Sequence, residues 1–321
     1  MKAAVATDKG LEVRDIPQPK PKPHEILVRV KAAGLNRADL NAARGAGGHG
    51  AVGATVGIDW AGEVVEAGSE VQGGFKPGDR VMCAGAGGYA EYAVADWGRV
   101  SPMPADFGFE QAATLPVAVN TMHDALITNG RLKPGERVLI QGASSGVGLM
   151  ALQIAKLMGA RLVIGTSTNA ARRGRLKEFG ADLAVDTSNP AWPEEVLKAT
   201  EGKGVNLIID QVSGSVAIGN LKATAILGRI VNVGRLGGGK AEFDFDLHAA
   251  RRITYIGVTH RTRSVEELRE ETRVMWRDLA TPIAAGKLHL PIDKVFPLGD
   301  AVAAHAHMKA NQHFGKILLI P

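Results

Sequence analysis

The sequence predicts an α/β protein in which a domain with a doubly wound parallel sheet is inserted into a β-rich domain. Three observations predict this fold class. Short strand-like runs fill the first third of the chain, strands and helices alternate from Val138 to Val233, and a strand, a helix and a strand close the chain. A length of 321 residues is enough for two domains that each bury a hydrophobic core.

The first third is typical of an antiparallel, barrel-like domain. The runs HEILVRVKAAGL, WAGEVVEAG, FKPGDRVMCAG and GGYAEYAVA are short and rich in β-forming residues, and glycine and proline separate them. The closing segment, which begins LPIDKVF and ends KILLIP, is expected to return to this domain. We therefore predict one domain from residues 1–118 and 287–321, and a second from residues 119–286.

The second domain is predicted from a regular alternation of strands and helices. Strands are expected at 138–141, 161–166, 184–186, 205–210 and 229–233, and helices at 146–158, 170–179, 194–201 and 216–225. Strands that alternate with helices form a parallel sheet that is covered on both faces. A further β-rich run at 253–259 is expected to be an edge strand.

Composition excludes several classes of protein. The net charge is +5, from 38 Lys and Arg against 33 Asp and Glu, and the basic residues are dispersed, which does not favour nucleic acid as a partner. No run approaches the ~20 apolar residues of a membrane span, and the first residues lack a leader pattern, so we expect a cytoplasmic protein. The one cysteine, Cys83, excludes an internal disulfide and is expected to be a buried, inert thiol.

A glycine-rich turn predicts a binding site for a dinucleotide. Gly142, Ser144, Ser145, Gly146 and Gly148 stand between the first strand and the first helix of the alternating region. Such a turn presents backbone N–H groups to a phosphate, and the helix N-terminus adds a favourable dipole. The strand–turn–helix context makes this pattern more specific than glycines alone.

The end of the next strand predicts NADPH as the cofactor. NAD sites usually carry Asp or Glu there for the ribose 2′-hydroxyl, whereas this strand ends in Thr166, Ser167 and Thr168. Arg172 and Arg173 follow, and guanidinium groups bind phosphate well. Which of the two arginines binds the 2′-phosphate stays open.

Ordered motifs along nearly the whole chain resemble the medium-chain dehydrogenases/reductases. They are AAGLNRADL, VGIDWAGEVVEAG, FKPGDRV, GGYAEYA, LKPGERVLIQGASSGVGLMALQIAK, FGAD and FGKILLIP. Within that family the chain is similar to the zinc-independent quinone oxidoreductases of the zeta-crystallin type. The resemblance implies a Rossmann domain inserted in a GroES-like domain, and NADPH-dependent hydride transfer to a quinone. An enone or enoyl-thioester reductase, and an NADPH-binding sensor or structural protein with little turnover, stay open as alternatives.

The resemblance also predicts a site without zinc. The family's ligand positions are occupied by Asn36, Ile58 and Val117, and Asp59 follows Ile58. An amide and two aliphatic side chains do not form a tetrahedral zinc shell. His305 and His307 are two residues apart in a helical stretch, so we expect them on different faces, as surface histidines.

The family pattern assigns roles to individual residues. It implies that Asn36 donates a hydrogen bond to the acceptor oxygen and that Thr121 contacts the nicotinamide half of the cofactor. The cofactor-binding residues that it implies are Ser144, Gly146, Val147, Thr168, Arg172, Gly234, Arg235, Phe314 and Lys316. The loop 41–57 is rich in small residues, which suggests a bulky acceptor, and relatives pair the edge strand at 253–259 across a two-fold axis, which predicts a homodimer.

Overall fold

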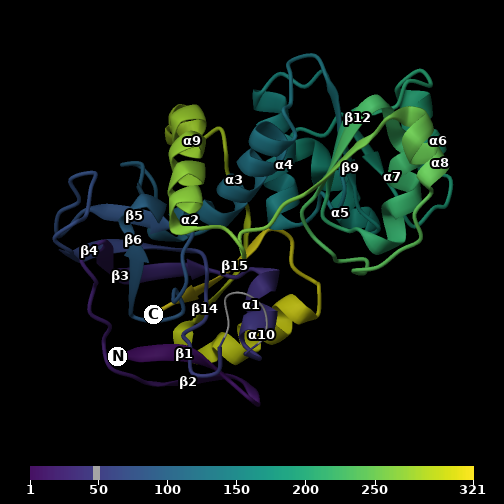
Figure 1. Ribbon diagram of the computed structural model, residues 1–321. Helices are drawn as coiled ribbons and strands as arrows, with labels where there is room; N and C mark the ends of the chain where they lie inside the picture. Colours follow the sequence, from purple (N-terminus) through teal and green to yellow (C-terminus); the bar gives the residue numbers. More distant parts are fainter. Residues whose placement is uncertain (46–50) are drawn as a thin grey trace. The chain divides into compact units, whose positions relative to one another are not determined.

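The computed structural model describes residues 1–45 and 51–321, and the chain folds into two compact units (Figure 1). Unit 1 consists of Met1–Asn120 and His260–Pro321, and unit 2 of Thr121–Thr259. Unit 2 is inserted in the sequence of unit 1, as predicted. The residues 46–50 of the small-residue loop lie outside the described part of the chain.

Unit 1 is built on a seven-stranded sheet with the order β14-β15-β3-β4-β5-β7, with β6 also paired to β3. Apart from the parallel pair β14 and β15, these strands pair in antiparallel fashion, and β1 and β2 form a separate hairpin. Its strands are β1 (Lys2–Thr7), β2 (Gly10–Asp15), β3 (Glu25–Gly34), β4 (Trp60–Ala67), β5 (Arg80–Cys83), β6 (Tyr92–Asp96), β7 (Val100–Pro102), β14 (Ile292–Pro297) and β15 (Lys316–Ile320). Its helices are α1 (Arg37–Ala42), α2 (Phe109–Ala112), α9 (Val265–Ala284) and α10 (Ala301–Lys309), while α3 (Pro116–His123) contains the boundary with unit 2.

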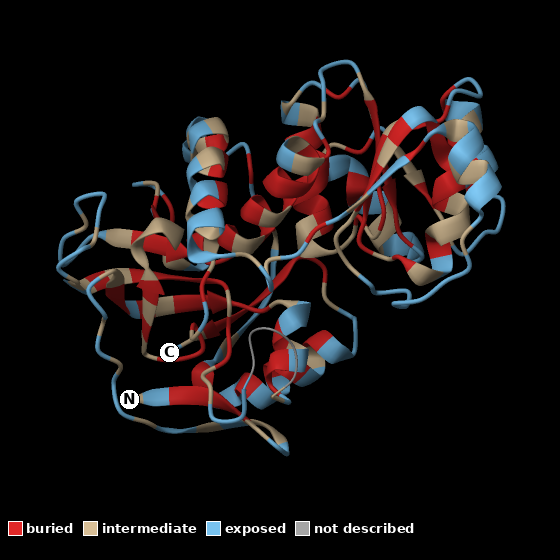
Figure 2. Cartoon of the chain, viewed as in Figure 1, coloured by how far each residue is buried: buried red, intermediate tan, exposed pale blue. Residues whose placement is uncertain are grey.

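The core of unit 1 lies on the strands that the alternating runs predict. Ile26, Val28 and Val30 of β3 lie two residues apart, on one face of the strand, and are buried, and Leu27 is buried on the other face. Figure 2 shows buried residues along the strands of the unit. Ile26, Val28 and Val30 pack in one cluster with Trp60 and Ile317, so residues from both ends of the chain share this core. This explains why the closing segment returns to the first domain.

Helix α9 marks a difference from the predicted domain boundary at residue 286. Its twenty residues belong to unit 1, because Arg269 pairs with Asp96 at 2.6 Å and its guanidinium lies over the Trp97 ring. Ser264 caps its N-terminus in a capping box with Glu267. The strand before α9 is Thr254–Gly257, the last strand of the sheet of unit 2. The chain therefore leaves unit 2 at Thr259, not at residue 286.

Unit 2 contains a six-stranded, wholly parallel sheet with the order β10-β9-β8-β11-β12-β13. The chain runs outward from β8 to one edge and then outward from β11 to the other, which is the doubly wound order expected. Its strands are β8 (Arg137–Ile140), β9 (Leu162–Thr166), β10 (Leu183–Val185), β11 (Val205–Asp210), β12 (Thr224–Asn232) and β13 (Thr254–Gly257). Its helices are α4 (Gly146–Leu157), α5 (Ala170–Arg175), α6 (Trp192–Ala199), α7 (Ala217–Ala223) and α8 (Phe245–Arg251).

Two local features of unit 2 depart from the predicted bounds. Strand β12 starts at Thr224 and not at 229, because the chain turns directly from α7 into the sheet. The helix predicted at 170–179 changes at Leu176 into a 3₁₀ turn that ends at Gly180 in a left-handed conformation, a common helix terminus. Helix α8 was not predicted, whereas the other strands and helices of unit 2 occur in the predicted order.

Candidate functional site

The glycine-rich turn opens helix α4 at the carboxyl end of β8. The Ser145 hydroxyl caps the helix by accepting a hydrogen bond from the Gly148 N–H at 3.1 Å. A Cβ on Gly148 would lie 2.6 Å from Ala143 Cα and from the Gly142 carbonyl oxygen, so only glycine allows this tight turn. The predicted residues Ser144, Gly146 and Val147 are partly exposed in the turn and the first helical turn, where a phosphate can approach the helix N-terminus.

The end of strand β9 lies next to this turn. The Ser144 and Ser167 hydroxyl oxygens are 3.0 Å apart, so the two adjacent strand ends present hydroxyl groups side by side. Thr168 is exposed just after them. Arg173 is held in place, because its Nη1 donates to the Ser167 carbonyl at 2.8 Å and pairs with Asp186 Oδ2 at 2.9 Å.

The remaining predicted residues of unit 2 lie farther along the chain. Gly234 and Arg235 follow β12, whose carboxyl end lies at the same edge of the parallel sheet as those of β8 and β9. The Gly234 N–H donates to the Asp210 carbonyl at 3.1 Å, and Arg235 is exposed. Thr121 is half-buried in α3. Their roles toward a cofactor stay predictions.

A buried hydrogen-bond chain below the turn was not predicted. Thr166 Oγ1 donates to Gln141 Oε1 at 2.8 Å, and Gln141 Nε2 donates to Asn220 Oδ1 at 2.7 Å. Asn220 Nδ2 donates in turn to Asp210 Oδ2 at 2.9 Å, and all four side chains are buried. The Thr166 hydroxyl also accepts from the Gly142 N–H at 3.1 Å, so the chain fixes the first glycine of the turn. Gln141, Thr166 and Asp210 lie at the ends of apolar strands, whereas Asn220 lies on α7, where no local pattern marks it.

Unit 1 contains a buried cluster around Lys316. The Lys316 ammonium donates to Asp59 Oδ2 at 2.7 Å and to Asn36 Oδ1 at 3.0 Å, and the Lys316 and Asp59 side chains are 4% and 0% exposed. Asp59 Oδ1 accepts from the Val117 N–H at 3.3 Å. Burial raises the pKa of Asp59 above its usual range, and the Lys316 ammonium opposes that rise. Asn36, half-buried before helix α1, is the member of the cluster that reaches the surface.

The backbone leaves room for the buried ammonium. A Cβ on Gly34 would lie 2.5 Å from the Ala113 carbonyl oxygen and 3.0 Å from Lys316 Cε, so a side chain there would collide with the backbone and press on the lysine. Strand β15 carries Lys316 to this place by pairing with the end of β3. Phe314, two residues earlier, is buried, and its N–H donates to Asp293 Oδ1 at 3.0 Å.

One of the three positions that the family resemblance assigns to zinc ligands, Asn36, contacts the Lys316 ammonium group. Asn36 and Asp59 accept hydrogen bonds from Lys316, and Ile58 and Val117 bring no side-chain ligand atom. The donor set of a carboxamide and an already paired carboxylate does not suit zinc, which prefers thiolate and imidazole.

A second buried group lies beside this cluster. The Tyr89 hydroxyl donates to Asp39 Oδ2 at 2.7 Å, and the same oxygen accepts from the Asn36 N–H at 2.7 Å. Burial raises the pKa of Asp39 to about 7. The prediction of a surface position is wrong for His305, which is buried edge-on against the Tyr89 ring, whereas His307 pairs with Asp293 at 2.9 Å. Burial lowers the pKa of His305 to about 4, because the charged imidazolium is poorly solvated there.

Cys83 is buried as predicted, and burial raises its pKa to about 12. A thiol of this kind is inert as a nucleophile because its thiolate is scarcely populated.

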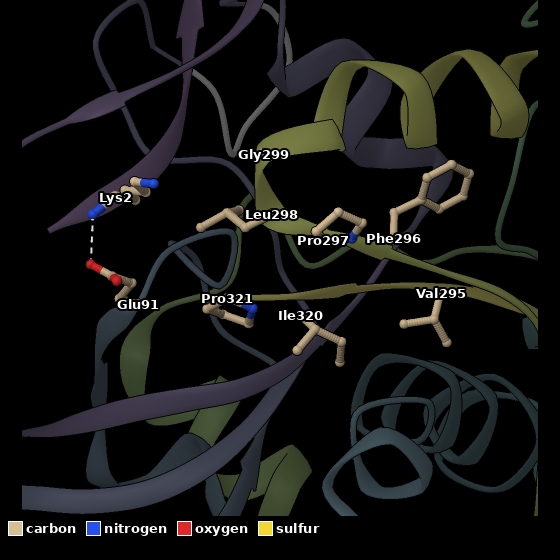
Figure 3. A pocket seen from close by; sticks show the side chains of 9 residues that line it. All are labelled: Lys2, Glu91, Val295, Phe296, Pro297, Leu298, Gly299, Ile320 and Pro321. Atoms are coloured by element: carbon tan, nitrogen blue, oxygen red, sulfur yellow. Dashed lines mark hydrogen bonds between the residues drawn. The ribbon is translucent and has the colours of Figure 1, made fainter.

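A cavity of about 560 Å³ lies elsewhere in unit 1, on the edge strand β14 and the end of the chain (Figure 3). Its walls are mainly apolar, and the Lys2 N–H donates to Glu91 Oε2 at its rim. The lining residues are Lys2, Glu91, Val295, Phe296, Pro297, Leu298, Gly299, Ile320 and Pro321. None belongs to the Lys316 cluster, so this cavity is separate from the candidate site. Among the described residues, no helix combines the length and the apolar character that a membrane crossing needs.

Comparison with known proteins identifies the family. The sequence model of the zinc-binding dehydrogenases matches residues 146–277, and that of the alcohol dehydrogenase GroES-like domain matches residues 22–105. The chain is 31% identical over 312 residues to a phenolphthiocerol/phthiocerol polyketide synthase of Mycobacterium tuberculosis. That match covers 97% of this chain but only 14% of the synthase polypeptide, so the chain spans about a seventh of such relatives.

Other relatives match from end to end. A quinone oxidoreductase of Pseudomonas aeruginosa is 31% identical over 322 residues, which cover 99% of this chain and 98% of that protein. The crystal structure of Escherichia coli quinone oxidoreductase complexed with NADPH is 26% identical, with a TM-score of 0.88, and the match covers 100% of this chain and 99% of that one. The chain belongs to the medium-chain dehydrogenase/reductase family, in the group of the quinone oxidoreductases.

Proposed function

We propose that this protein is an NADPH-dependent oxidoreductase that transfers hydride to a quinone without a metal ion. The observation that carries the proposal is the pair of strand ends at β8 and β9, where a capped glycine turn meets neutral hydroxyls and arginines. The end-to-end likeness to quinone oxidoreductases supports the acceptor class.

The residues of unit 2 fit a dinucleotide with a 2′-phosphate. At Gly148 the backbone of α4 packs closely against Ala143 and Gly142, and Ser145 caps the helix. This arrangement leaves the N-terminus of α4 open to the pyrophosphate. Asp186, a carboxylate that follows β10, is neutralised by Arg173, so it does not repel a phosphate. We propose Arg172, which the family pattern assigns to this role and which lies in the first turn of the helix after β9, as the arginine that binds the 2′-phosphate.

The residues of unit 1 fit an electron-poor carbonyl acceptor. When bound, NADPH supplies a hydride, that is, two electrons and one hydrogen nucleus. Hydride addition to a quinone leaves negative charge on an oxygen, and the Asn36 carboxamide donates a hydrogen bond to that oxygen. A proton from solvent then completes the hydroquinone, so one NADPH and one proton are consumed for each quinone.

A second candidate function is the reduction of an enone or an enoyl thioester. The match to a segment of a polyketide synthase favours this alternative. The same donor at Asn36 serves an enone, because hydride addition to the β-carbon also places negative charge on the carbonyl oxygen.

We also propose that the protein forms a homodimer through β13. This strand pairs with β12 on one side and is the last strand of the sheet, and Tyr255 on it is 39% exposed. Phe245, which packs with Phe243 near Tyr255, is 76% exposed. An open edge strand with exposed aromatic residues is a favourable pairing surface.

The test is NADPH oxidation against a panel of ortho- and para-quinones and of linear and cyclic enones, with NADH as the control cofactor. The proposal predicts turnover of quinones and a preference for NADPH. Turnover confined to enones or enoyl thioesters would assign the second function. Tight NADPH binding without turnover of any acceptor would instead indicate a sensor or structural role.

A further inference from the structure

The Lys316 ammonium has a second hydrogen bond, to Asn36, beyond the ion pair with Asp59 that neutralises its charge. It is buried and paired with Asp59 at 2.7 Å, and a single carboxylate neutralises its charge. Its second acceptor is Asn36 Oδ1 at 3.0 Å, on a carboxamide that reaches the surface. A buried cation is therefore coupled to the polar group that is best placed to meet a ligand.

This contact determines which way the Asn36 carboxamide points. A lysine ammonium has only donors, so the Asn36 atom that faces it is the oxygen, and the NH₂ group is left to face the Gly34 carbonyl and Asp59. Asn36 Nδ2 is 3.3 Å from the Gly34 carbonyl oxygen and 3.4 Å from Asp59 Oδ2. Both distances exceed the usual 2.7–3.2 Å range of N–H···O bonds, so the NH₂ group is oriented but only weakly held.

The same contact strengthens the NH₂ group as a donor. The positive ammonium group that donates to the amide oxygen draws electrons away from the amide nitrogen. The N–H groups of the carboxamide therefore become stronger donors, and the effect is largest where water is excluded. Asp59 holds the ammonium in place, and its other oxygen is fixed by the Val117 N–H. The two residues behind Asn36 thus form a rigid, charged support.

On the basis of the proposed hydride transfer, we infer that Lys316 is a positioning residue that acts through Asn36. It fixes the Asn36 oxygen on the ammonium, so that the NH₂ group exchanges its long contacts with Gly34 and Asp59 for the carbonyl oxygen of the acceptor, and it increases the strength of that group as a hydrogen-bond donor. When hydride forms a new bond to the acceptor, the electron pair that it displaces comes to rest on that oxygen. The hydrogen bond from the Asn36 NH₂ group is then stronger to the charged oxygen than to the neutral carbonyl. It stabilises the transition state more than the bound acceptor, so its effect appears in kcat.

The test compares Lys316 variants in two backgrounds. Lys316→Met alone leaves Asp59 charged and buried, so the main variant is Lys316→Met/Asp59→Asn, which removes both charges and keeps the volumes. It is measured in the wild-type background and in the Asn36→Ala background. The readouts are kcat, the acceptor KM and the Kd for NADPH from fluorescence titration, with circular dichroism as the check of folding.

We expect the paired variant to lower kcat about tenfold, with the Kd for NADPH unchanged within about twofold. In the Asn36→Ala background the same two substitutions should change kcat by less than about twofold, because the Asn36 carboxamide through which Lys316 acts is absent. Asn36→Ala alone should lower kcat about 100-fold.

Three results would overturn the inference. One is an equal loss of kcat in both backgrounds, which would make Lys316 independent of Asn36. Another is a rise in the Kd for NADPH with kcat unchanged, which would make Lys316 a cofactor ligand. The third is an Asn36→Ala variant with full kcat, which decides the matter even if the paired variant does not fold. A wild-type protein that reduces no acceptor overturns the proposed function and this inference together, whereas an active wild type with any of these three results overturns the inference alone.

Discussion

The Tyr89 hydroxyl donates to Asp39 Oδ2 at 2.7 Å, and both side chains are completely buried. The carboxyl group also faces the Asn36 N–H, Lys316 and Asp59. Burial outweighs the hydrogen bonds and the Lys316 charge, and it raises the pKa of Asp39 to about 7. The native state therefore binds a proton in a pH range in which the unfolded chain has already lost it.

This pair predicts a loss of stability as the pH rises. Below the unfolded pKa of 3.8 the carboxyl group is protonated in both states, and between there and about 7 only the native state holds the proton. The difference in unfolding free energy between wild type and Asp39→Asn should fall by up to about 4 kcal/mol from pH 4 to pH 8. Urea unfolding across that range measures it, with Asp106→Asn on an exposed loop as the control. A difference that stays constant with pH would contradict a raised pKa.

Arg172 is predicted to determine the preference for NADPH. Arg172→Ala should raise the KM for NADPH about 30-fold, which corresponds to about 2 kcal/mol for a lost charge-assisted phosphate contact, and should leave the KM for NADH unchanged. Arg175→Ala is the matched control, because Arg175 lies on the same helix and pairs with Glu178 at 3.1 Å. Equal effects on both cofactors, or equal effects of the two substitutions, would show that Arg172 does not contact the 2′-phosphate.

Gly148→Ala is predicted to damage the phosphate turn. Its Cβ would lie 2.6 Å from the backbone of Ala143 and Gly142, so the turn must open. We expect a loss of about 1–3 kcal/mol in unfolding free energy and at least a tenfold weaker Kd for NADPH. The control is Gly174→Ala on α5, where a Cβ meets nothing within 4 Å and alanine favours the helix. A Gly148→Ala variant that binds NADPH like the control would exclude this turn as the phosphate site.

The open edge at β13 predicts a dimer that charges can disrupt. Light scattering at micromolar concentration should give twice the mass of the chain, and Phe245→Lys with Tyr255→Lys should give the monomer mass, because two lysines at a two-fold interface repel their copies. A control with Val302→Lys, which is also exposed but lies on α10, should stay dimeric. A monomeric wild type would refute the dimer, and a dimeric double variant would place its interface elsewhere.

The sequence predicts the order of elements in unit 2 because each strand and helix carries its own local pattern. The glycines of the turn, the apolar strand before it and the helix after it lie within about twenty residues, so their relationship can be inferred without the fold. Helices α8 and α9 were not predicted, and the boundary expected at 286 differs from the observed one at Thr259. The contact that assigns α9 to unit 1, Arg269 with Asp96, joins residues 173 positions apart.

The Lys316 cluster escaped prediction for the same reason. The Lys316 contacts with Asn36 and Asp59 span 280 and 257 positions, and no local pattern indicates such a pairing. The family resemblance assigned Asn36 and Lys316 separately to the site, but not to each other. His305 was expected at the surface because helical periodicity shows that two histidines lie on different faces, but not which face is buried.

Hydride transfer without a metal ion is tested by the stoichiometry of quinone reduction by chelator-treated protein. NADPH consumed and hydroquinone formed would be quantified together under anaerobic conditions, after metal ions have been removed. Metal-free hydride transfer predicts one hydroquinone for each NADPH, at the rate of the untreated protein. Activity that disappears on chelation and returns with added zinc, or NADPH oxidation without hydroquinone, would contradict it.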